Sequence, residues 1–399
     1  MSTILSGGRI VLQDSILEPG SLVLDDGLIS DVRAGSIDRA AADWHDMHGC
    51  LLVPGFIDVH VHGVEGIDTL ATADAVAKLA ARFPKYGVTG FCPTTVGCSP
   101  LALRRLLDGI RAARIANLPG HAAVHPAHLE SNFINPDFRG AQPVHCIRLP
   151  NREVRPGVDG DVAFSGQEIL DEIARARPEV GILTIAPELD GTLDLIRDLT
   201  AAGHIVSLGH SGATYEQGLS GVDAGARHAT HLFNRMPPFS HRAPGLVGAI
   251  FERNEVSAEI VCDGYHVHPV VARTAVRALG RSRTMGITDG TAAAGLPIGT
   301  TVPLGSHTIR AGDEAAFLAD GTLAGSTLTM DGAFQRITRL FGLSEVDAAH
   351  LCATTPARQL GLTDRGRLAA GQRADIAVLD RDLRVVNTFV AGVLAAPPV

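Results

Sequence analysis

The 399-residue chain contains no run of 18 apolar residues, so we expect no membrane-spanning helix. Its six cysteines show neither C-x-x-C spacing nor a compact framework, which predicts reduced thiols and a cytoplasmic location. The opening stretch MSTILSGGRIVLQDS lacks a secretory h-region, so we expect no export signal. A net charge of -9, a single tryptophan and the lack of a basic stripe argue against nucleic acid as a partner.

What the sequence does contain is a repeated alternation of apolar runs and Ala/Leu/Arg-rich stretches after residue 54. With 45% hydrophobic residues, the chain is long enough for one large core and an appendage. We expect strands at 55–61, 87–95, 121–130, 180–188, 204–211, 227–234, 255–264 and 283–290. We expect helices between them, for example at 72–86, 100–116, 190–203 and 268–280. Eight strand–helix cycles predict an α/β fold of the TIM type, a (β/α)8 barrel.

Both ends of the chain have the alternation typical of β-strands. Short strands are expected in residues 1–50, with a hairpin signal at Asp25–Asp26–Gly27, and the pattern returns at 366–393. We therefore predict two domains. They are a small β-sandwich built from residues 1–53 and 358–399, and a catalytic barrel of residues 54–357.

The first barrel strand carries the stretch PGFIDVHVHG at residues 54–63. Because side chains alternate along a strand, Asp58, His60 and His62 are expected to share one face. Three polar side chains in a buried strand are costly unless they are paired. They are either hydrogen-bonded core residues or ligands of a metal, and the strand alone leaves both readings open.

Histidines and carboxylates end six of the eight predicted strands, which is where a barrel of this kind carries its chemistry. Independent core histidines would not be expected to gather at one rim. Imidazoles with a carboxylate suit Zn²⁺ or Fe²⁺, and the number of candidates allows one or two ions per chain. The residues at these strand ends are His60, His62, His128, Glu130, His210, His231, Asn234, Asp263, His266, His268 and Asp289.

Such a centre suits a metal-dependent hydrolase. A metal-bound water loses its proton near neutral pH and becomes a nucleophile. Asp289 is placed to accept that proton and give it to a leaving nitrogen, while His266 is placed to donate to the substrate.

An ordered set of motifs resembles the N-acetylglucosamine-6-phosphate deacetylases of the amidohydrolase superfamily. The motifs are PGFIDVHVHG, HLE, LGHS, THLFN-MPP, R-PG, DGYHV, TDG, LAGSTLTMD and the closing pattern RG-LA-G--AD. The resemblance implies a metal-dependent enzyme that removes acetate from an amino-sugar phosphate, usually as a cytoplasmic homodimer.

The family's functional positions fall on residues of this chain. Its main metal site corresponds to Glu130, His210 and His231, and its catalytic aspartate to Asp289, while His60 and His62 add a second candidate ion site. Arg242 corresponds to an arginine that reaches across the dimer to the phosphate. The expected substrate contacts are Ala141, Gln142, Asn234, Arg235, Arg242, His266, Leu323, Ala324 and Gly325.

Several positions depart from the family pattern. They are Ser131, Asn132, Gln142, Arg235 and Gly290. Because these changes fall on loops expected to read the sugar, the sugar epimer, the acyl group and the phosphate position stay open. Arg235 could meet a differently placed anion or pair with an acidic neighbour, and the sequence favours neither.

Two alternatives to this deacetylase remain open. The first is a related amidohydrolase that acts on a different N-acyl amino sugar, such as the galactosamine epimer, on an N-acyl amino acid, or on a cyclic amide. Chemistry based on a carboxylated lysine is disfavoured, because the only lysines, Lys78 and Lys85, lie in the helix after the first strand. The last is a catalytically inactive barrel used for binding, which the intact ligand set argues against.

Overall fold

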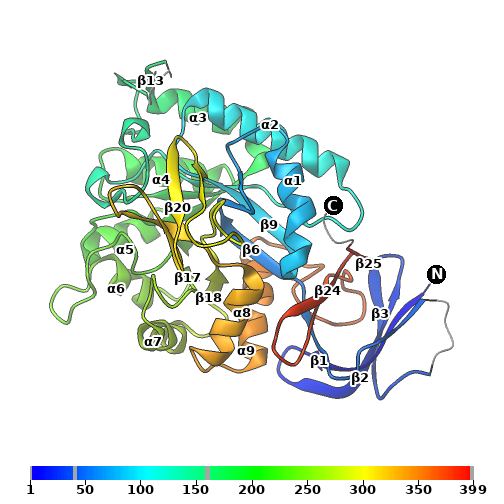
Figure 1. Ribbon diagram of the computed structural model, residues 1–399. Helices are drawn as coiled ribbons and strands as arrows, with labels where there is room; N and C mark the ends of the chain where they lie inside the picture. The colour runs from blue at the N-terminus through cyan, green and yellow to red at the C-terminus, as the bar shows by residue number, and fades with distance from the viewer. Residues whose placement is uncertain (1, 39–42, 158–161, 396–399) are drawn as a thin grey trace.

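The computed structural model describes residues 2–38, 43–157 and 162–395, and its centre is a parallel barrel (Figure 1). Its hydrogen-bonded strand order runs β6, β9, β11, β14, β15, β16, β17 and β18. The strands are β6 (Phe56–Val61), β9 (Val88–Thr95), β11 (Ala127–Glu130), β14 (Val180–Ile185), β15 (Ile205–Leu208), β16 (His228–Ala229), β17 (Ser257–Val261) and β18 (Thr284–Ile287). Each lies within one of the eight predicted stretches, which confirms the predicted barrel.

The barrel is joined where its last strand meets its first. Val61 forms a parallel bridge with Gly290. The backbone N–H of Asp289 donates to the carbonyl of His60 at 3.0 Å, and that of His62 donates to the carbonyl of Gly290 at 2.7 Å. Two histidines and an aspartate from opposite ends of the barrel sequence are thus brought together by backbone hydrogen bonds.

A helix follows each barrel strand. These are α1 (Ala75–Arg82), α2 (Pro100–Ala116), α3 (Gly166–Arg175), α4 (Thr192–Ala201), α5 (Tyr215–Asp223), α6 (Gly245–Glu252), α7 (Pro269–Leu279) and α8 (Met330–Arg339). Several of these helices begin at an N-cap residue whose side chain accepts a hydrogen bond from the first turn. Ser99 accepts from the N–H of Ala102 at the start of α2, and Ser165 forms a capping box with Glu168 in α3. The four helices predicted by range correspond to α1, α2, α4 and α7.

Both chain ends combine into one mixed eight-stranded sheet beside the barrel (Figure 1). Its strands are β1 (Thr3–Val11), β2 (Ile16–Asp25), β3 (Leu28–Ala34), β4 (Asp43–Asp46), β5 (Leu51–Pro54), β23 (Ile376–Leu379), β24 (Val385–Val390) and β25 (Val393–Leu394). Asp26 and Gly27 have φ of 49° and 80°, as the predicted hairpin at this position requires. The exact domain boundaries at 53/54 and 357/358 stay a prediction, and residues 1, 39–42 and 396–399 of the small domain lie outside the described ranges.

An antiparallel meander between β18 and α8 was not predicted. It consists of β19 (Thr301–Leu304), β20 (His307–Ala311), β21 (Ala315–Phe317) and β22 (Leu323–Ser326). Val302, Ile309 and Ala324 pack with Ala292 and Val96 in a core of their own. The meander is drawn in yellow in Figure 1.

The remaining elements are short. They are β7 (Gly63–Val64), β8 (Ile67–Asp68), β10 (Ala123–Val124), β12 (Val154–Arg155), β13 (Phe164–Ser165), α9 (Glu345–Ala349), a π turn (His350–Thr354), α10 (Thr355–Gln359) and the 3-10 turns Phe83–Tyr86, Pro136–Phe138, Val144–Cys146 and Arg177–Glu179. Within the described ranges, no helix has both the length and the apolar character needed to span a bilayer.

Candidate metal centre and active site

Glu130, at the end of β11, lies at the centre of the site. Its Oε1 is 2.8 Å from Nε2 of His210 and 2.8 Å from Nε2 of His231. Those two ring nitrogens are 3.0 Å apart. The other carboxylate oxygen, Oε2, is 3.4 Å from Nε2 of His62. One carboxylate therefore faces two groups of histidines, as a bridging ligand between two cations would.

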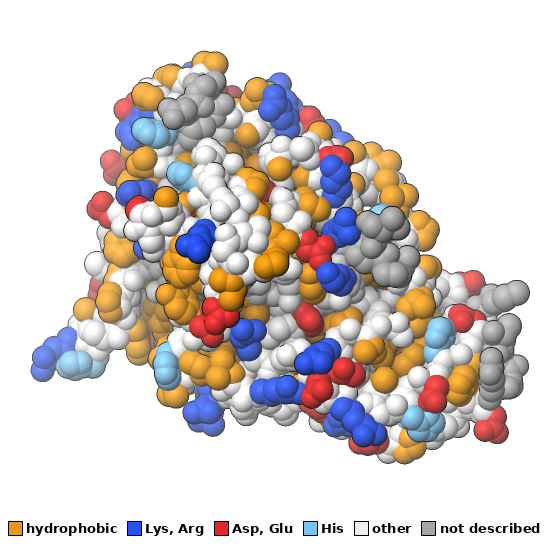
Figure 2. All heavy atoms as spheres, in the orientation of Figure 1, with side chains coloured by type: hydrophobic (Ala, Val, Ile, Leu, Met, Phe, Trp, Pro, Cys, Tyr) orange, Lys and Arg blue, Asp and Glu red, His pale blue; other side chains and the backbone are white. Residues whose placement is uncertain are grey.

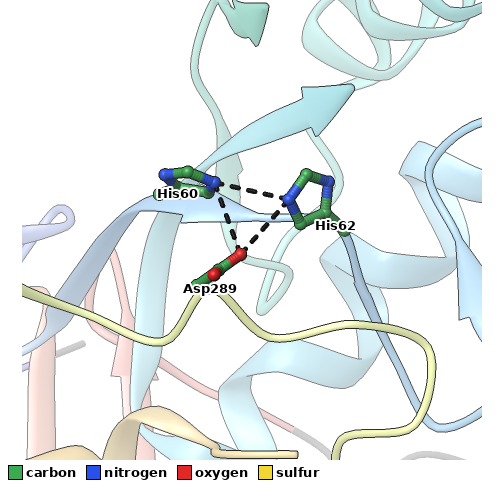
Figure 3. Close-up of side chains that lie close together, drawn as sticks. All are labelled: His60, His62 and Asp289. Atoms are coloured by element: carbon green, nitrogen blue, oxygen red, sulfur yellow. Dashed lines mark hydrogen bonds and ion pairs between the residues drawn. The ribbon is translucent and has the colours of Figure 1, made fainter. Parts of the chain in front are cut away.

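The second group contains His60, His62 and Asp289 (Figure 3). Nε2 of His60 and Nε2 of His62 are 3.3 Å apart. Oδ1 of Asp289 lies 3.5 Å from Nε2 of His60 and 3.3 Å from Nε2 of His62. Asp58 does not join them. Its carboxylate accepts from Thr288 Oγ1, and burial raises the pKa of Asp58 to about 7. Asp58 is thus a hydrogen-bonded core residue, whereas His60 and His62 belong to the candidate metal centre.

The orientation of the imidazoles fits a divalent cation. Nδ1 of His210 is 2.9 Å from the carbonyl of Phe138, and Nδ1 of His60 is 2.9 Å from Oε2 of Glu259. Because a carbonyl and an ionised carboxylate only accept, both Nδ1 atoms carry a proton and both Nε2 atoms face the site, where each could bind a cation after losing its own proton. Histidine nitrogens with two carboxylates form the donor set that zinc and iron prefer.

The charges in this buried cluster are strongly coupled. Burial lowers the pKa of His60 and of His62, but the surrounding carboxylates outweigh it and raise these pKa values to about 9 and about 10. Burial favours a protonated Asp289, yet the charge of His60 and a hydrogen bond from His62 hold its pKa below the usual value. The pKa of Glu130 is likewise lowered by His210 and His60 against the effect of burial. The carboxylates are therefore ionised and attract positive charge into the site.

The backbone at the strand ends is unusual. His210, His231 and Asp289 have φ of 47°, 28° and 48°, in the left-handed region that non-glycine residues seldom adopt. Such conformations cluster at functional sites, where the surrounding structure holds them. Here they turn the side chains of β15, β16 and β18 inward at the point where each strand ends.

His266 lies beside the cluster and is held by Asp263. Its Nδ1 is 2.5 Å from Oδ2 of Asp263, and its backbone N–H donates to Oδ1 of the same carboxylate at 2.8 Å. Nε2 is left facing the site, 4.0 Å from Oδ2 of Asp289. Burial lowers the pKa of His266, but the hydrogen bond to Asp263 more than compensates and raises it overall. His266 is therefore suited to donate a hydrogen bond or a proton.

These side chains line one pocket. Most of the predicted site residues line it, and so does Leu304 of the meander. His60 is fully buried beneath the pocket. Arg242 does not line it and lies exposed on the loop between β16 and α6. The predicted residues on its wall are His62, Glu130, Ala141, Gln142, His210, His231, Asn234, Arg235, His266, Asp289, Leu323, Ala324 and Gly325.

Only two of the five departures from the family pattern reach this pocket. Ser131 is buried and donates to the carbonyl of Thr184, and Asn132 donates to the carbonyls of Cys98 and Cys146. A Cβ on Gly290 would come within 2.9 Å of Thr288 Oγ1, so the absence of a side chain there relieves a close contact. These three residues therefore support the loops around the pocket and do not line it.

Gln142 and Arg235 are the two that line the pocket. The amide nitrogen of Gln142 donates to Oε2 of Glu130, and its oxygen accepts from the N–H of Gly97 at 2.7 Å. Gln142 thus holds the central carboxylate, in addition to forming part of the wall. Arg235, with φ of 52°, forms no side-chain ion pair within the described residues, which leaves its guanidinium free for a ligand.

Glu259 and His228 were not predicted from the sequence. Glu259 is fully buried in β17, and it contacts His60 of β6 and His228 of β16. Its partners come from distant parts of the chain, so no local spacing marks it. The available signal was a glutamate inside the apolar strand VSAEIV, since a buried carboxylate requires partners.

Comparison with known proteins agrees with this geometry. The model of the Amidohydrolase family matches residues 51–395. N-acetylglucosamine-6-phosphate deacetylase of Bacillus subtilis is 32% identical, over 99% of this chain and 97% of that protein. N-acetylgalactosamine-6-phosphate deacetylase of Escherichia coli O157:H7 is also 32% identical, over 99% of this chain and 100% of that protein.

A solved structure gives the same result. The crystal structure of N-acetyl-D-glucosamine-6-phosphate deacetylase from Mycobacterium smegmatis superposes with a TM-score of 0.88 at 32% identity. The match covers 99% of this chain and 100% of that one. A variant of that enzyme was solved in complex with N-acetyl-D-glucosamine-6-phosphate. The chain described here belongs to the amidohydrolase family and, within it, to the N-acetylglucosamine-6-phosphate deacetylases.

Proposed function

We propose that the protein hydrolyses N-acetylglucosamine 6-phosphate to glucosamine 6-phosphate and acetate. The observation that carries this proposal is the convergence of Glu130, His210, His231, Asp289 and His266 on one pocket. The substrates named for the relatives support the same assignment.

We propose that two divalent ions, of zinc or iron, occupy the site. Glu130, His210 and His231 would hold one, His60, His62 and Asp289 would hold the other, and Glu130 would face both. When bound, such ions supply a Lewis acid for the amide carbonyl and a water of lowered pKa.

Asp289 is the proposed proton carrier. Its lowered pKa keeps it ionised at neutral pH, so its carboxylate can accept a proton from the attacking water. As the C–N bond breaks, the same carboxylate returns the proton to the leaving amine, and acetate is released. His266, oriented by Asp263, donates to the substrate from a position beside Asp289.

The loop between β16 and α6 is the proposed point of contact between two subunits. Phe239 is 53% exposed there, and Arg242 is exposed close by. Figure 2 shows basic and histidine side chains at the tip of a loop that projects from the molecule beside α6. We propose that the enzyme is a cytoplasmic homodimer in which Arg242 reaches the phosphate bound by the partner subunit, while Arg235 approaches it from within the same chain.

Replacing either arginine should weaken the binding of phosphorylated substrate. We expect Arg235→Ala and Arg242→Ala each to raise KM about 10- to 100-fold, because a hydrogen bond to a charged group contributes about 1.5–3 kcal/mol. The kcat should change little. Arg197→Ala is a matched control, since Arg197 is exposed and, among the residues that the structure describes, its ion pair is with Asp194 on its own helix. If the unphosphorylated sugar loses as much kcat/KM as the phosphorylated one, the arginine does not bind the phosphate.

The substrate assignment is tested by measuring acetate release with metal-quantified protein. We expect a high kcat/KM for N-acetylglucosamine 6-phosphate and much lower values for its galactosamine epimer and for the unphosphorylated sugar. A higher kcat/KM for the galactosamine epimer would change the assigned substrate but leave the assigned reaction, amide hydrolysis, in place. Metal-loaded protein that releases no acetate from any of them would contradict the proposed function and support a binding role for the barrel.

A further inference from the structure

Glu259 is a fully buried carboxylate that no step of the proposed mechanism uses. Its Oε2 accepts from Nδ1 of His60 at 2.9 Å and from the backbone N–H of His231 at 3.0 Å. Its Oε1 lies 2.8 Å from Nε2 of His228. The carboxylate therefore accepts from three N–H groups.

These contacts connect the two halves of the metal centre. His60 belongs to the group with His62 and Asp289, and His231 belongs to the group with Glu130 and His210. A single oxygen of Glu259 accepts from both, through the ring of His60 and the backbone of His231. Oε2 of Glu259 thus links His60, on β6, to His231, which follows β16.

Glu259 does not form a third metal site with its neighbours. His60, His128 and Glu259 lie close enough together to suggest one. However, Nδ1 of His128 is 3.0 Å from the carbonyl of Val59, so it carries the proton, and its Nε2 accepts from Thr184 at 2.9 Å. Burial lowers the pKa of His128 to about 3, so this ring is neutral and has no lone pair directed at Glu259. The contacts of Glu259 are those of a carboxylate that orients ligands.

We propose that Glu259 is a positioning residue that fixes His60 as a ligand of the second divalent cation. By accepting from Nδ1 of His60, it keeps a proton on that atom and turns Nε2 toward Asp289 and His62. Its negative charge also makes the imidazole a stronger donor to a cation. This inference rests on the metal centre of the proposed function, and it names the residue that controls one half of that centre.

The alternative is that Glu259 only fills space in the barrel. A buried carboxylate is a poor choice for that purpose, because an apolar residue of similar volume needs no partners. A purely structural role would also predict that His60 and Glu259 contribute independently to metal binding. The two explanations are separated by measuring whether their effects are coupled.

The test uses full-length Glu259→Gln protein, which keeps the shape of the side chain and removes its charge. Metal-free protein is titrated with Zn²⁺ by calorimetry, and the ions per chain are counted after dialysis. We expect one ion to bind with unchanged affinity and the other about 10- to 100-fold more weakly. Glu172→Gln is the matched control, because Glu172 is also buried but pairs with Arg104 and Arg175 away from the site. Glu259→Asp keeps the charge but shortens its reach to His60, and it gives the same test if the glutamine variant does not fold.

A double-mutant cycle shows through which residue Glu259 acts. In a His60→Asn background, adding Glu259→Gln should cause no further loss of Zn²⁺ affinity. An equal loss with and without His60 would overturn the proposal and show that Glu259 acts elsewhere, for instance through His231. Wild-type affinity of Glu259→Gln for both ions would overturn it as well. If the wild-type protein binds no ion at all, the proposed metal centre itself fails, which is a different result.

Discussion

Asp289→Asn protein is expected to fold but to lose most of its turnover. Asparagine has the same shape, and it tolerates the left-handed backbone that Asp289 adopts with φ of 48°. Its amide cannot accept the proton of the attacking water or return one to the leaving amine. Because general acid–base catalysis contributes about 10²- to 10⁴-fold, kcat should fall by that factor. Acetate release at saturating substrate measures the effect.

The control for this substitution is Asp375→Asn, in the strand region of the small sheet. Asp375 is as buried as Asp289, but it pairs with Arg373 at 3.1 Å and Arg365 at 3.4 Å, outside the pocket. We expect that variant to keep wild-type kcat at a temperature where it remains folded. Metal analysis of Asp289→Asn should still find the ion at Glu130, His210 and His231. Wild-type turnover of the asparagine variant would show that another residue carries the proton.

Glu130→Gln should remove metal as well as activity. Glu130 is the one carboxylate that faces His210 and His231 with Oε1 and His62 with Oε2. A neutral amide is a weaker ligand and presents an N–H₂ group to one of the two groups of histidines. The Lewis acid contributes several kcal/mol, and each 1.36 kcal/mol is a factor of ten, so kcat/KM should fall about a thousandfold or more.

Elemental analysis after dialysis checks this result, beside Glu172→Gln as the buried but remote control. Wild-type protein stripped with a chelator should lose its activity and regain it when Zn²⁺ or Fe²⁺ is returned. The glutamine variant should not regain activity under the same conditions. A variant that retains the wild-type metal content would place the principal ligands elsewhere in the barrel.

The barrel could be predicted from the sequence because each strand is a short apolar run that ends in polar residues. The end of β15, LGHS, and the end of β16, THLFN, show this clearly, since the histidine follows directly after the apolar residues. Positions at strand ends all meet at one rim, so local patterns were sufficient to assemble Glu130, His210, His231 and Asp289 into one candidate site.

Other features depend on contacts that no local pattern contains. The meander of β19–β22 falls where an ordinary barrel has a loop, although the residues from Thr301 to Ala311 alternate around a Gly305–Ser306 turn. Ser131 and Asn132 looked like specificity residues because they follow the HLE motif, yet their partners, Thr184, Cys98 and Cys146, lie on other segments. Glu259 was missed for the same reason, since its three partners lie on other strands or at their ends.

The hydrogen bond from the Asp289 N–H to the His60 carbonyl has a consequence for biosynthesis. The two residues belong to the last and first strands of the barrel, so one is synthesised early and the other only after most of the chain. Contacts between segments so distant in sequence form late and slowly during folding. A nascent chain therefore has no hydrolytic activity while its last strands are still inside the ribosome. Hydrolytic activity therefore requires that the last barrel strand has paired with the first.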